Sequence, residues 1–152
     1  MITSLRTRLF QSWFRFSRSV TFGVRAIVSN ERGEVLVVRH TYVDGLYLPG
    51  GGVERNETAY DAIQRELIEE AGVKIMDLPK LFGVYSNHHV FRNDHVVCFH
   101  IQNWQQVEMT SQGEISEVLW IDPEAPPTDC TPGTKRRLKA LVAGWESDHA
   151  FW

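Results

Sequence analysis

The sequence predicts an α/β fold in which helices cover the faces of a mixed β-sheet. Short segments rich in β-branched residues recur along the chain, and segments with apolar residues at three- and four-residue steps lie among them. Glycine- and proline-rich stretches separate the two kinds of element. Because strands and helices interleave along one chain of 152 residues, we expect helices layered on a sheet within a single domain.

The first predicted element is a basic amphipathic helix over residues 2–16. Its arginines face away from an apolar stripe formed by Ile2, Leu5, Leu9, Trp13 and Phe16. We expect residues 1–18 to pack their aromatic side against the domain formed by residues 19–152. The alternative is contact with an anionic membrane surface through residues 2–16, which a basic amphipathic helix would also permit.

The next elements are predicted from alternation and from turn residues. Residues 20–29 and 34–41 resemble two strands joined by a turn at 30–33, which together predict a hairpin. A helix is expected over 57–72 with Gly72 as its stop, and strands are expected near 73–86, 94–104 and 117–121. Four of the six prolines place a loop at 123–132, before a final helix at 134–145.

Composition and charge narrow the class of function. Hydrophobic residues make up 43% of the chain and charged residues 23%, as in an ordinary globular protein. A net charge of −3 gives no overall attraction to nucleic acid, although all five charges of the first thirty residues are positive. Cys98 and Cys130 are too few for a disulfide framework, so we expect reduced thiols and a cytoplasmic location.

Three glutamates on the helix predicted at 57–72 form the most informative pattern. At about 100° per residue, Glu66, Glu69 and Glu70 fall within an arc of about 100° on one helix face. Such like charges repel one another. Mg²⁺, which prefers carboxylate and phosphate oxygens, would offset them. The alternative is a solvated acidic face, but the glycines at 50–52 favour a ligand site because backbone can approach a ligand there.

Residues 51–73 resemble the Nudix box, G-x5-E-x7-R-E-U-x-E-E-x-G-U, in which U is a bulky aliphatic residue. Every specified position is matched, by Gly51, Glu57, Arg65, Glu66, Leu67, Glu69, Glu70, Gly72 and Val73. The resemblance implies an α/β/α sandwich around a mixed sheet. It also implies hydrolysis of a nucleoside diphosphate linked to another moiety. We predict direct attack of water on phosphorus, because this reaction requires no covalent enzyme intermediate.

The resemblance also implies roles for individual residues. Glu66, Glu69 and Glu70 would bind Mg²⁺, with Mn²⁺ as a second candidate, and the Gly50 carbonyl would be a backbone ligand. Arg65 and Glu57 match positions that brace the loop and the helix. The general base would be Glu66 or Glu114, and Glu114 is alternatively a further metal ligand.

Substrate contacts are sought on the strands that approach this segment. Arg25 and Arg39 could clamp a phosphate, and Tyr47 could stack on a base or fill the core. The expected partner is a small-molecule nucleotide: an ADP-sugar or ADP-ribose, a nucleoside triphosphate or a dinucleoside polyphosphate. A catalytically weak nucleotide sensor on the same fold is the alternative function, and a homodimer is suggested by family analogy alone.

Overall fold

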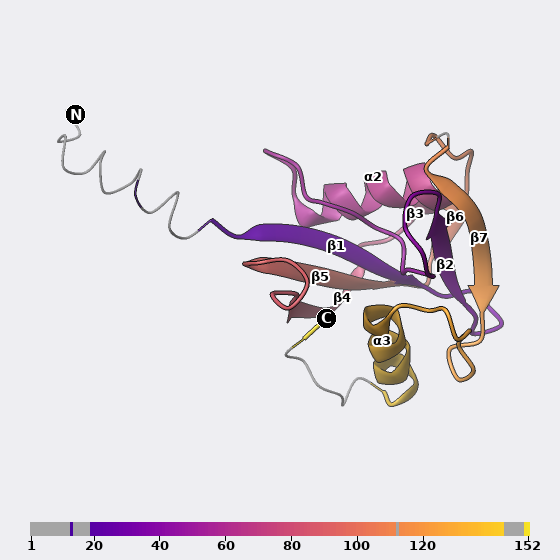
Figure 1. Ribbon diagram of the computed structural model, residues 1–152. Helices are drawn as coiled ribbons and strands as arrows, with labels where there is room; N and C mark the ends of the chain where they lie inside the picture. Colours follow the sequence, from indigo (N-terminus) through magenta and orange to yellow (C-terminus); the bar gives the residue numbers. More distant parts are fainter. Residues whose placement is uncertain (1–12, 14–18, 112, 145–150) are drawn as a thin grey trace.

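A computed structural model describes residues 13, 19–111, 113–144 and 151–152 of the chain. Strands form a central layer, with helix α2 on one side and helix α3 on the other (Figure 1). This arrangement confirms the predicted α/β class with a mixed sheet. The elements are β1 (Thr21–Val28), β2 (Val35–His40), α2 (Ala59–Ala71), β3 (Val73–Ile75), β4 (Lys80–Ser86), β5 (Asp94–Ile101), β6 (Trp104–Gln106), β7 (Ile115–Ile121) and α3 (Pro132–Val142).

The strands pair in three groups. The largest group has the order β1-β5-β4, with β1 parallel and β4 antiparallel to β5. Strand β2 pairs antiparallel with β7, and β3 pairs antiparallel with β6. Most partners are therefore far apart in the sequence.

The predicted hairpin of residues 20–41 is wrong, although both of its strands exist. Strand β1 pairs with β5 and strand β2 pairs with β7, so the two strands belong to different groups. Between them remain the isolated bridge from Ser29 to Val35 and the turn hydrogen bond from Asn30 N to the Glu34 carbonyl. The turn predicted at residues 30–33 is present, but a turn does not determine which strands pair across a sheet.

Capping residues explain where the two helices begin and end. Thr58 caps α2 by accepting a hydrogen bond from the Asp61 N–H, and Gly72 ends this helix at φ 61°. The helix predicted at 57–72 is thus confirmed to within two residues. Helix α3 begins two residues earlier than predicted, because Thr131 is its cap and Pro132 suits the first helical turn, where no N–H partner is needed.

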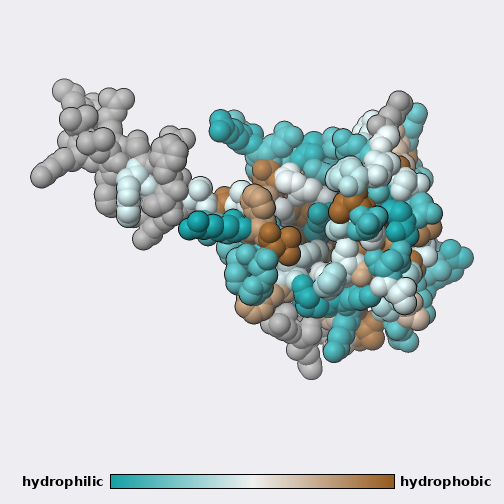
Figure 2. Space-filling model, in the orientation of Figure 1, coloured by the Kyte–Doolittle hydropathy of each residue, from teal (hydrophilic) through white to brown (hydrophobic). Residues whose placement is uncertain are grey.

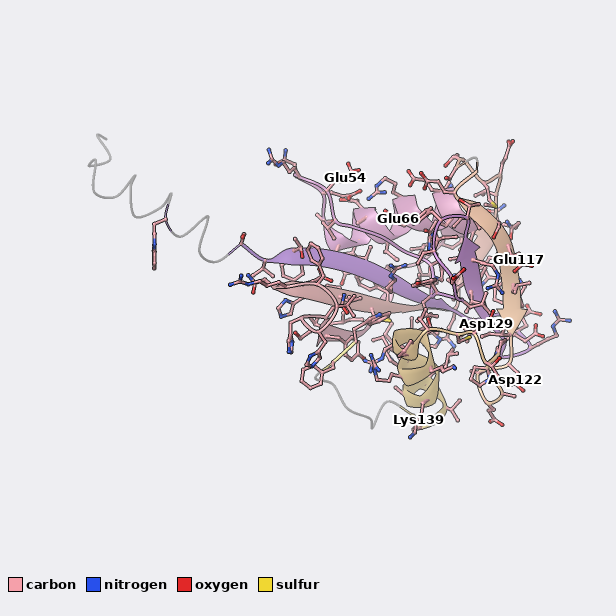
Figure 3. All side chains as sticks on the ribbon, viewed as in Figure 1. Glu54, Glu66, Glu117, Asp122, Asp129 and Lys139 are labelled. Carbon is pink, nitrogen blue, oxygen red and sulfur yellow. The ribbon has the colours of Figure 1, made fainter. Side chains whose placement is uncertain are left out.

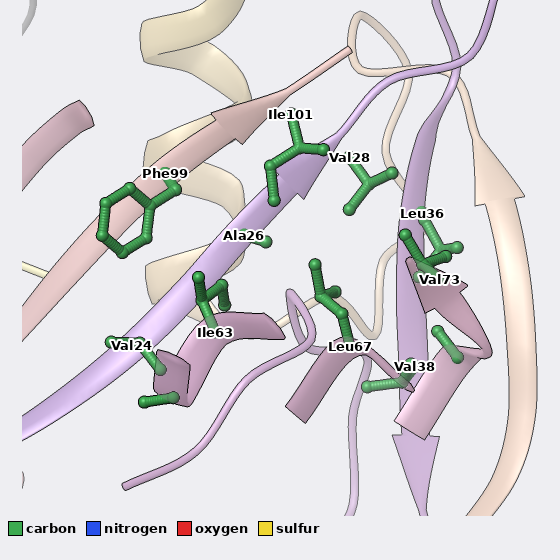
Figure 4. Close-up of a cluster of buried hydrophobic side chains, with 12 residues drawn as sticks. Val24, Ala26, Val28, Leu36, Val38, Ile63, Leu67, Val73, Phe99 and Ile101 are labelled. Atoms are coloured by element: carbon green, nitrogen blue, oxygen red, sulfur yellow. The ribbon is translucent and has the colours of Figure 1, made fainter. Parts of the chain in front are cut away.

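Each face of the strand layer carries its own hydrophobic cluster. On the α2 side, Ile63 and Leu67 pack against strand residues that include Val24, Ala26 and Phe99 (Figure 4). On the α3 side, a second cluster combines the following residues: Ile27, Val35, Val37, Leu46, Leu48, Phe82, Tyr85, Cys98, Ile121, Cys130, Leu138 and Ala140. Alternate residues of β1 and β2 face opposite clusters, as expected for strands buried on both sides.

Apart from exposed Trp13, the predicted helix at 2–16 lies outside the described residues, so its packing stays a prediction. In the described part of the chain, no helix is long and apolar enough to cross a membrane. Hydrophilic side chains cover most of the face seen in Figure 2, with hydrophobic ones scattered among them. Cys98 and Cys130 are free, buried thiols.

Candidate active site

The glycine-rich loop lies against the free edge of β1. The Val24 N–H donates to the Gly51 carbonyl at 2.8 Å, and the Ala26 N–H donates to the Pro49 carbonyl at 2.9 Å. Gly50 has a φ of 137°, and a Cβ at this position would overlap the Val24 carbonyl oxygen. Only glycine fits so close to the strand. The loop that precedes α2 is therefore held by the sheet itself.

Arg25 fastens this loop from β1. One terminal nitrogen, Nη1, donates to the Leu48 carbonyl at 3.0 Å and to the Gly50 carbonyl at 2.6 Å. Arg25 was predicted to clamp a phosphate, and the Gly50 carbonyl was predicted to bind the metal. The two groups meet here, so a cation at Gly50 would have to use the second lone pair of that carbonyl oxygen.

Glu70 is the buried carboxylate of the site, with only 6% of the residue exposed. Its Oε2 accepts a hydrogen bond from the Gly50 N–H at 2.8 Å, which ties helix α2 to the loop. Burial raises the pKa of Glu70 to about 7, despite this hydrogen bond. An opposite charge beside Glu70 would therefore stabilise its ionised form.

His40 is a site residue that the sequence analysis missed. Its Nε2 lies 3.7 Å from Oε1 of Glu70, and its ring contacts those of Tyr42 and Tyr47. Burial and the charge of Arg25 lower the pKa of His40, so the imidazole beside Glu70 is neutral near pH 7. A single histidine at the end of a strand does not indicate a functional role in the sequence, because only the fold brings His40 close to α2.

Glu66 belongs to α2 (Figure 3), and its carboxylate lies against Gly51 of the loop. A Cβ on Gly51 would lie 2.5 Å from its Oε1, so the carboxylate occupies space that only a glycine leaves open. Arg65 donates to the same oxygen at 2.7 Å. Burial raises the pKa of Glu66 in spite of that guanidinium.

Arg65 joins the loop and helix, as the sequence suggested. Its Nε donates to Oε1 of Glu57 at 2.9 Å, and Nη2 donates to the Gly52 carbonyl at 3.1 Å. Hydrogen bonding to Arg65 lowers the pKa of Glu57, and hydrogen bonding to Glu57 is the main reason that the pKa of Arg65 is raised. Arg65 also reaches Oε2 of Glu69 at 3.3 Å.

Glu69 and Glu114 lie at the more open side of this group. The Glu69 side chain is 39% exposed. Glu114 is also exposed, and its carbonyl accepts a hydrogen bond from the Thr41 N–H. Its charge contributes to the raised pKa of Glu70, which places Glu114 within electrostatic reach of the buried carboxylate. Glu57, Arg65, Glu66 and Glu70 thus lie at or beside the glycine-rich loop, and Glu69 is joined to them through Arg65.

The carboxylates of α2 suit a hard cation, although Arg65 donates hydrogen bonds to two of the three predicted ligands, Glu66 and Glu69. Among the described residues, no three His, Cys, Asp or Glu side chains are grouped tightly enough to hold a metal ion as they stand. However, Glu66 and Glu70 are two partly or fully buried carboxylates with raised pKa values, and both contact the Gly50–Gly51 backbone. A bound divalent cation would stabilise the ionised form of these carboxylates, which burial disfavours.

A pocket of about 340 Å³ adjoins the loop on the α3 side. Arg25 donates to the Gly50 carbonyl of the loop and also lines the pocket, so the loop and the pocket share this residue. Aromatic, apolar and amide side chains line it together with two arginines: Arg25, Tyr47, Leu48, Asn87, Val90, Thr131, Pro132, Gly133, Thr134, Arg136 and Trp152. Such a mixture suits a planar organic group bearing a negative charge.

Tyr47 and Arg39, the other two predicted substrate contacts, lie in different places. Tyr47 both lines the pocket and packs against the core, with Arg25 6.0 Å from its ring centre. Arg39 does not line the pocket, because Glu117 and Asp129 hold its guanidinium at 2.5 and 2.8 Å. Figure 3 places both of these carboxylates away from Glu66. The structure therefore does not bring Arg39 to the site.

Fold and site together define a class, an α/β/α protein in which a glycine-rich loop and a glutamate-bearing helix form an acidic centre beside an organic-group pocket. A family model described as NUDIX domain matches residues 20–141. The chain belongs to the Nudix hydrolase family, and the prediction of a Nudix pyrophosphohydrolase is confirmed.

Two sequence relatives illustrate the range of the family. A Bacillus subtilis (strain 168) protein named "Putative 8-oxo-dGTP diphosphatase" is 31% identical over 82% of this chain and 81% of its own length. A Haemophilus influenzae protein named NAD-capped RNA hydrolase NudC is 36% identical over 67% of this chain, but over only 42% of its own length.

Solved structures support the fold. The E. coli ORF135 protein superimposes with a TM-score of 0.69 at 24% identity, covering 88% of this chain and 98% of that protein. An ADP-ribose pyrophosphatase from Streptococcus suis superimposes with a TM-score of 0.65 at 18% identity, covering 88% of this chain and all of that protein. At these identities the likeness concerns the fold alone.

Proposed function

We propose that this protein hydrolyses the phosphoanhydride of a nucleoside diphosphate linked to another moiety, with Mg²⁺ or Mn²⁺ as cofactor. The observation that carries the proposal is the meeting of two buried or half-buried carboxylates, Glu66 and Glu70, at the Gly50–Gly51 backbone. The adjoining pocket supports a substrate with an organic part beside its phosphates.

Glu66, Glu69 and Glu70 would hold the cation, with Glu114 as a further candidate ligand. A bound divalent cation neutralises phosphoryl oxygens and lowers the pKa of a coordinated water. Arg65 and Glu57 act by position, because their hydrogen bonds join the loop at Gly52 to helix α2. Arg25 positions the loop from the other side and can contact a phosphate from the pocket wall.

The reaction is a direct displacement at phosphorus. The oxygen of water bonds to one phosphorus atom, the bridging P–O bond breaks, and the leaving phosphate carries the electron pair away. The water proton passes to a carboxylate, for which we propose Glu66 and Glu114 as the two candidates. Separate Glu66→Gln and Glu114→Gln variants distinguish them, because loss of the base lowers kcat and removes the acidic limb of the pH–rate profile.

The substrate class follows from the size of the pocket and from the relatives. A pocket of about 340 Å³ accommodates one nucleoside, with its phosphates directed past Arg25 toward the carboxylates. We propose a nucleoside triphosphate as the first substrate, since the relative that spans 82% of this chain is named for an oxidised one. ADP-ribose and dinucleoside polyphosphates are the alternatives.

A substrate panel tests the proposal. Nucleoside triphosphates, their 8-oxo forms, ADP-ribose, dinucleoside polyphosphates and a short capped RNA are incubated with Mg²⁺ or Mn²⁺ in ¹⁸O-labelled water. Mass spectrometry identifies the products, and the label shows which phosphorus was attacked. Cleavage of an anhydride with one ¹⁸O in one product is expected. Nucleotide binding without cleavage of any substrate would overturn the proposal and favour the nucleotide sensor.

A further inference from the structure

The segment Phe151–Trp152 lies against the open edge of β4, beside the pocket. Trp152 N donates to the Ser86 carbonyl at 3.0 Å, and Phe151 forms a parallel bridge with Ser86. The Phe151 ring contacts His88 and His89 at centre distances of 5.5 and 5.1 Å. These contacts bring a segment distant from the Nudix box to the nucleotide pocket.

Arg137 anchors the segment from α3. This residue is 1% exposed, its guanidinium lies 3.6 Å from the centre of the Tyr85 ring, and Nη2 donates to the Phe151 carbonyl at 3.0 Å. Nε and Nη1 have no hydrogen-bond partner among the described residues. A buried charge with so few partners is costly. The hydrogen bond from Arg137 to the Phe151 carbonyl therefore stabilises the docked position of the segment.

Trp152 separates two hollows. It lines the 340 Å³ pocket next to Arg25 and also a neighbouring pocket of about 320 Å³, which is lined by Phe151 and His89. Asn87, Val90 and Arg136 line both pockets. Trp152 has the largest of the four side chains that line both pockets, so the indole forms much of the partition between them.

We propose that Trp152 is a specificity-determining residue that limits the nucleotide pocket to a single nucleoside and contacts its base. Arg137 is the positioning residue that keeps Trp152 in place. The inference rests on the proposed function only in taking the pocket to hold a nucleoside. Without the partition, the joined cavity would accept a two-base ligand in place of one nucleoside.

Gly133 offers a way to move Trp152 without changing it. A Cβ at Gly133 would overlap Nε1 of the indole, so Gly133→Ala must displace the ring. Alanine also has a higher helix propensity than glycine, which offsets part of the cost of displacing the ring. Lys139→Ala is the matched control, because it makes a helix-favouring change at an exposed position of α3 that lines neither pocket (Figure 3).

The test measures binding in the presence of a chelator, so that no turnover is needed. Calorimetry gives the Kd of a nucleoside monophosphate and of a dinucleoside polyphosphate for the full chain and for Trp152→Ala, Gly133→Ala and Lys139→Ala. We expect both pocket variants to bind the monophosphate roughly five- to hundredfold more weakly, the range for losing one base–aromatic contact. The dinucleoside ligand should lose less, and the control should match the unaltered chain.

Arg137→Met gives the second readout. It should shift the ratio of the two Kd values in the same direction as Trp152→Ala, while kcat for a cleaved substrate stays unchanged and KM changes. Equal losses for both ligands, or unchanged Kd values in both pocket variants, would overturn the inference. These outcomes are separate from the substrate panel, since binding can change as expected even if no anhydride is cleaved.

Discussion

The two sides of the strand layer contribute to the site in different ways. On the α2 side, Glu66, Glu69 and Glu70 come from one helix, whose spacing places them on one face. On the α3 side, the pocket wall is assembled from β1, the segment before α2, the β4–β5 loop, α3 and Trp152. Chemistry is thus encoded locally, whereas recognition depends on the tertiary fold.

This difference teaches where substitutions should separate catalysis from binding. Glu66 and Glu70 on α2 touch the loop, and Arg65 links Glu66 to Glu69, but none of these carboxylates lines the pocket. The Arg25 side chain donates to the loop carbonyls and also lines the pocket. Changes on α2 should therefore affect turnover, changes in the pocket wall should affect affinity, and a change at Arg25 should affect both.

The largest effect is expected from Glu69→Gln and Glu70→Gln. Each keeps the side-chain volume but removes an anionic oxygen, so kcat at saturating Mg²⁺ should fall by about 100-fold or more, above the range for residues that only support a ligand. The Kd of a nucleoside monophosphate should stay the same. Glu124→Gln, on the exposed loop before α3, is the control. Equal turnover would contradict the ligand assignment.

A smaller, double effect is expected from Arg25→Met. The variant loses charged hydrogen bonds to the Leu48 and Gly50 carbonyls, each worth about 1.5–3 kcal/mol. Urea unfolding should show lower stability, and both KM and kcat should worsen. Arg25→Lys retains one point charge and should recover part of both losses. A change in KM with kcat and stability intact would show that Arg25 serves the pocket alone.

Glu70 predicts how the stability of the metal-free protein depends on pH. Its pKa is raised from an ordinary 4.5 to about 7, so the folded chain holds a proton that the unfolded chain has lost between these values. The contribution of Glu70 therefore makes the free energy of unfolding fall as pH rises from 4.5 to 7. Urea titrations in chelator should show this decline in the unaltered chain but not in Glu70→Gln. Parallel curves for the two proteins would refute the raised pKa.

The smallest effect is expected from Arg39→Gln. Its guanidinium is paired with Glu117 and Asp129 at the surface and does not line the pocket. Exposed pairs contribute little, so kcat and KM should change by less than about twofold. A tenfold rise in KM would show that Arg39 contacts the substrate. It would contradict the assignment of substrate binding to the pocket wall.

The sequence indicated that three glutamates share one helix face and that Arg25 and Tyr47 lie near them, but it did not indicate His40 or Trp152, for a physical reason. Glu66, Glu69 and Glu70 are related by helical spacing, which the chain carries locally. His40 and Trp152 reach the site only after β2, β4 and α3 have assembled. The false hairpin has the same cause, since a turn at 30–33 specifies a change of direction but not the partner of β1. The sequence shows the types of these residues but not their positions in the folded protein.

Cys98 lies wholly within the cluster between the strands and α3, and burial raises the pKa of its thiol to about 12. A thiol held in this way reacts with alkylating reagents only when the surrounding structure opens. The alkylation rate of Cys98 would therefore report how often the structure on the pocket side opens. A bound nucleotide should lower that rate.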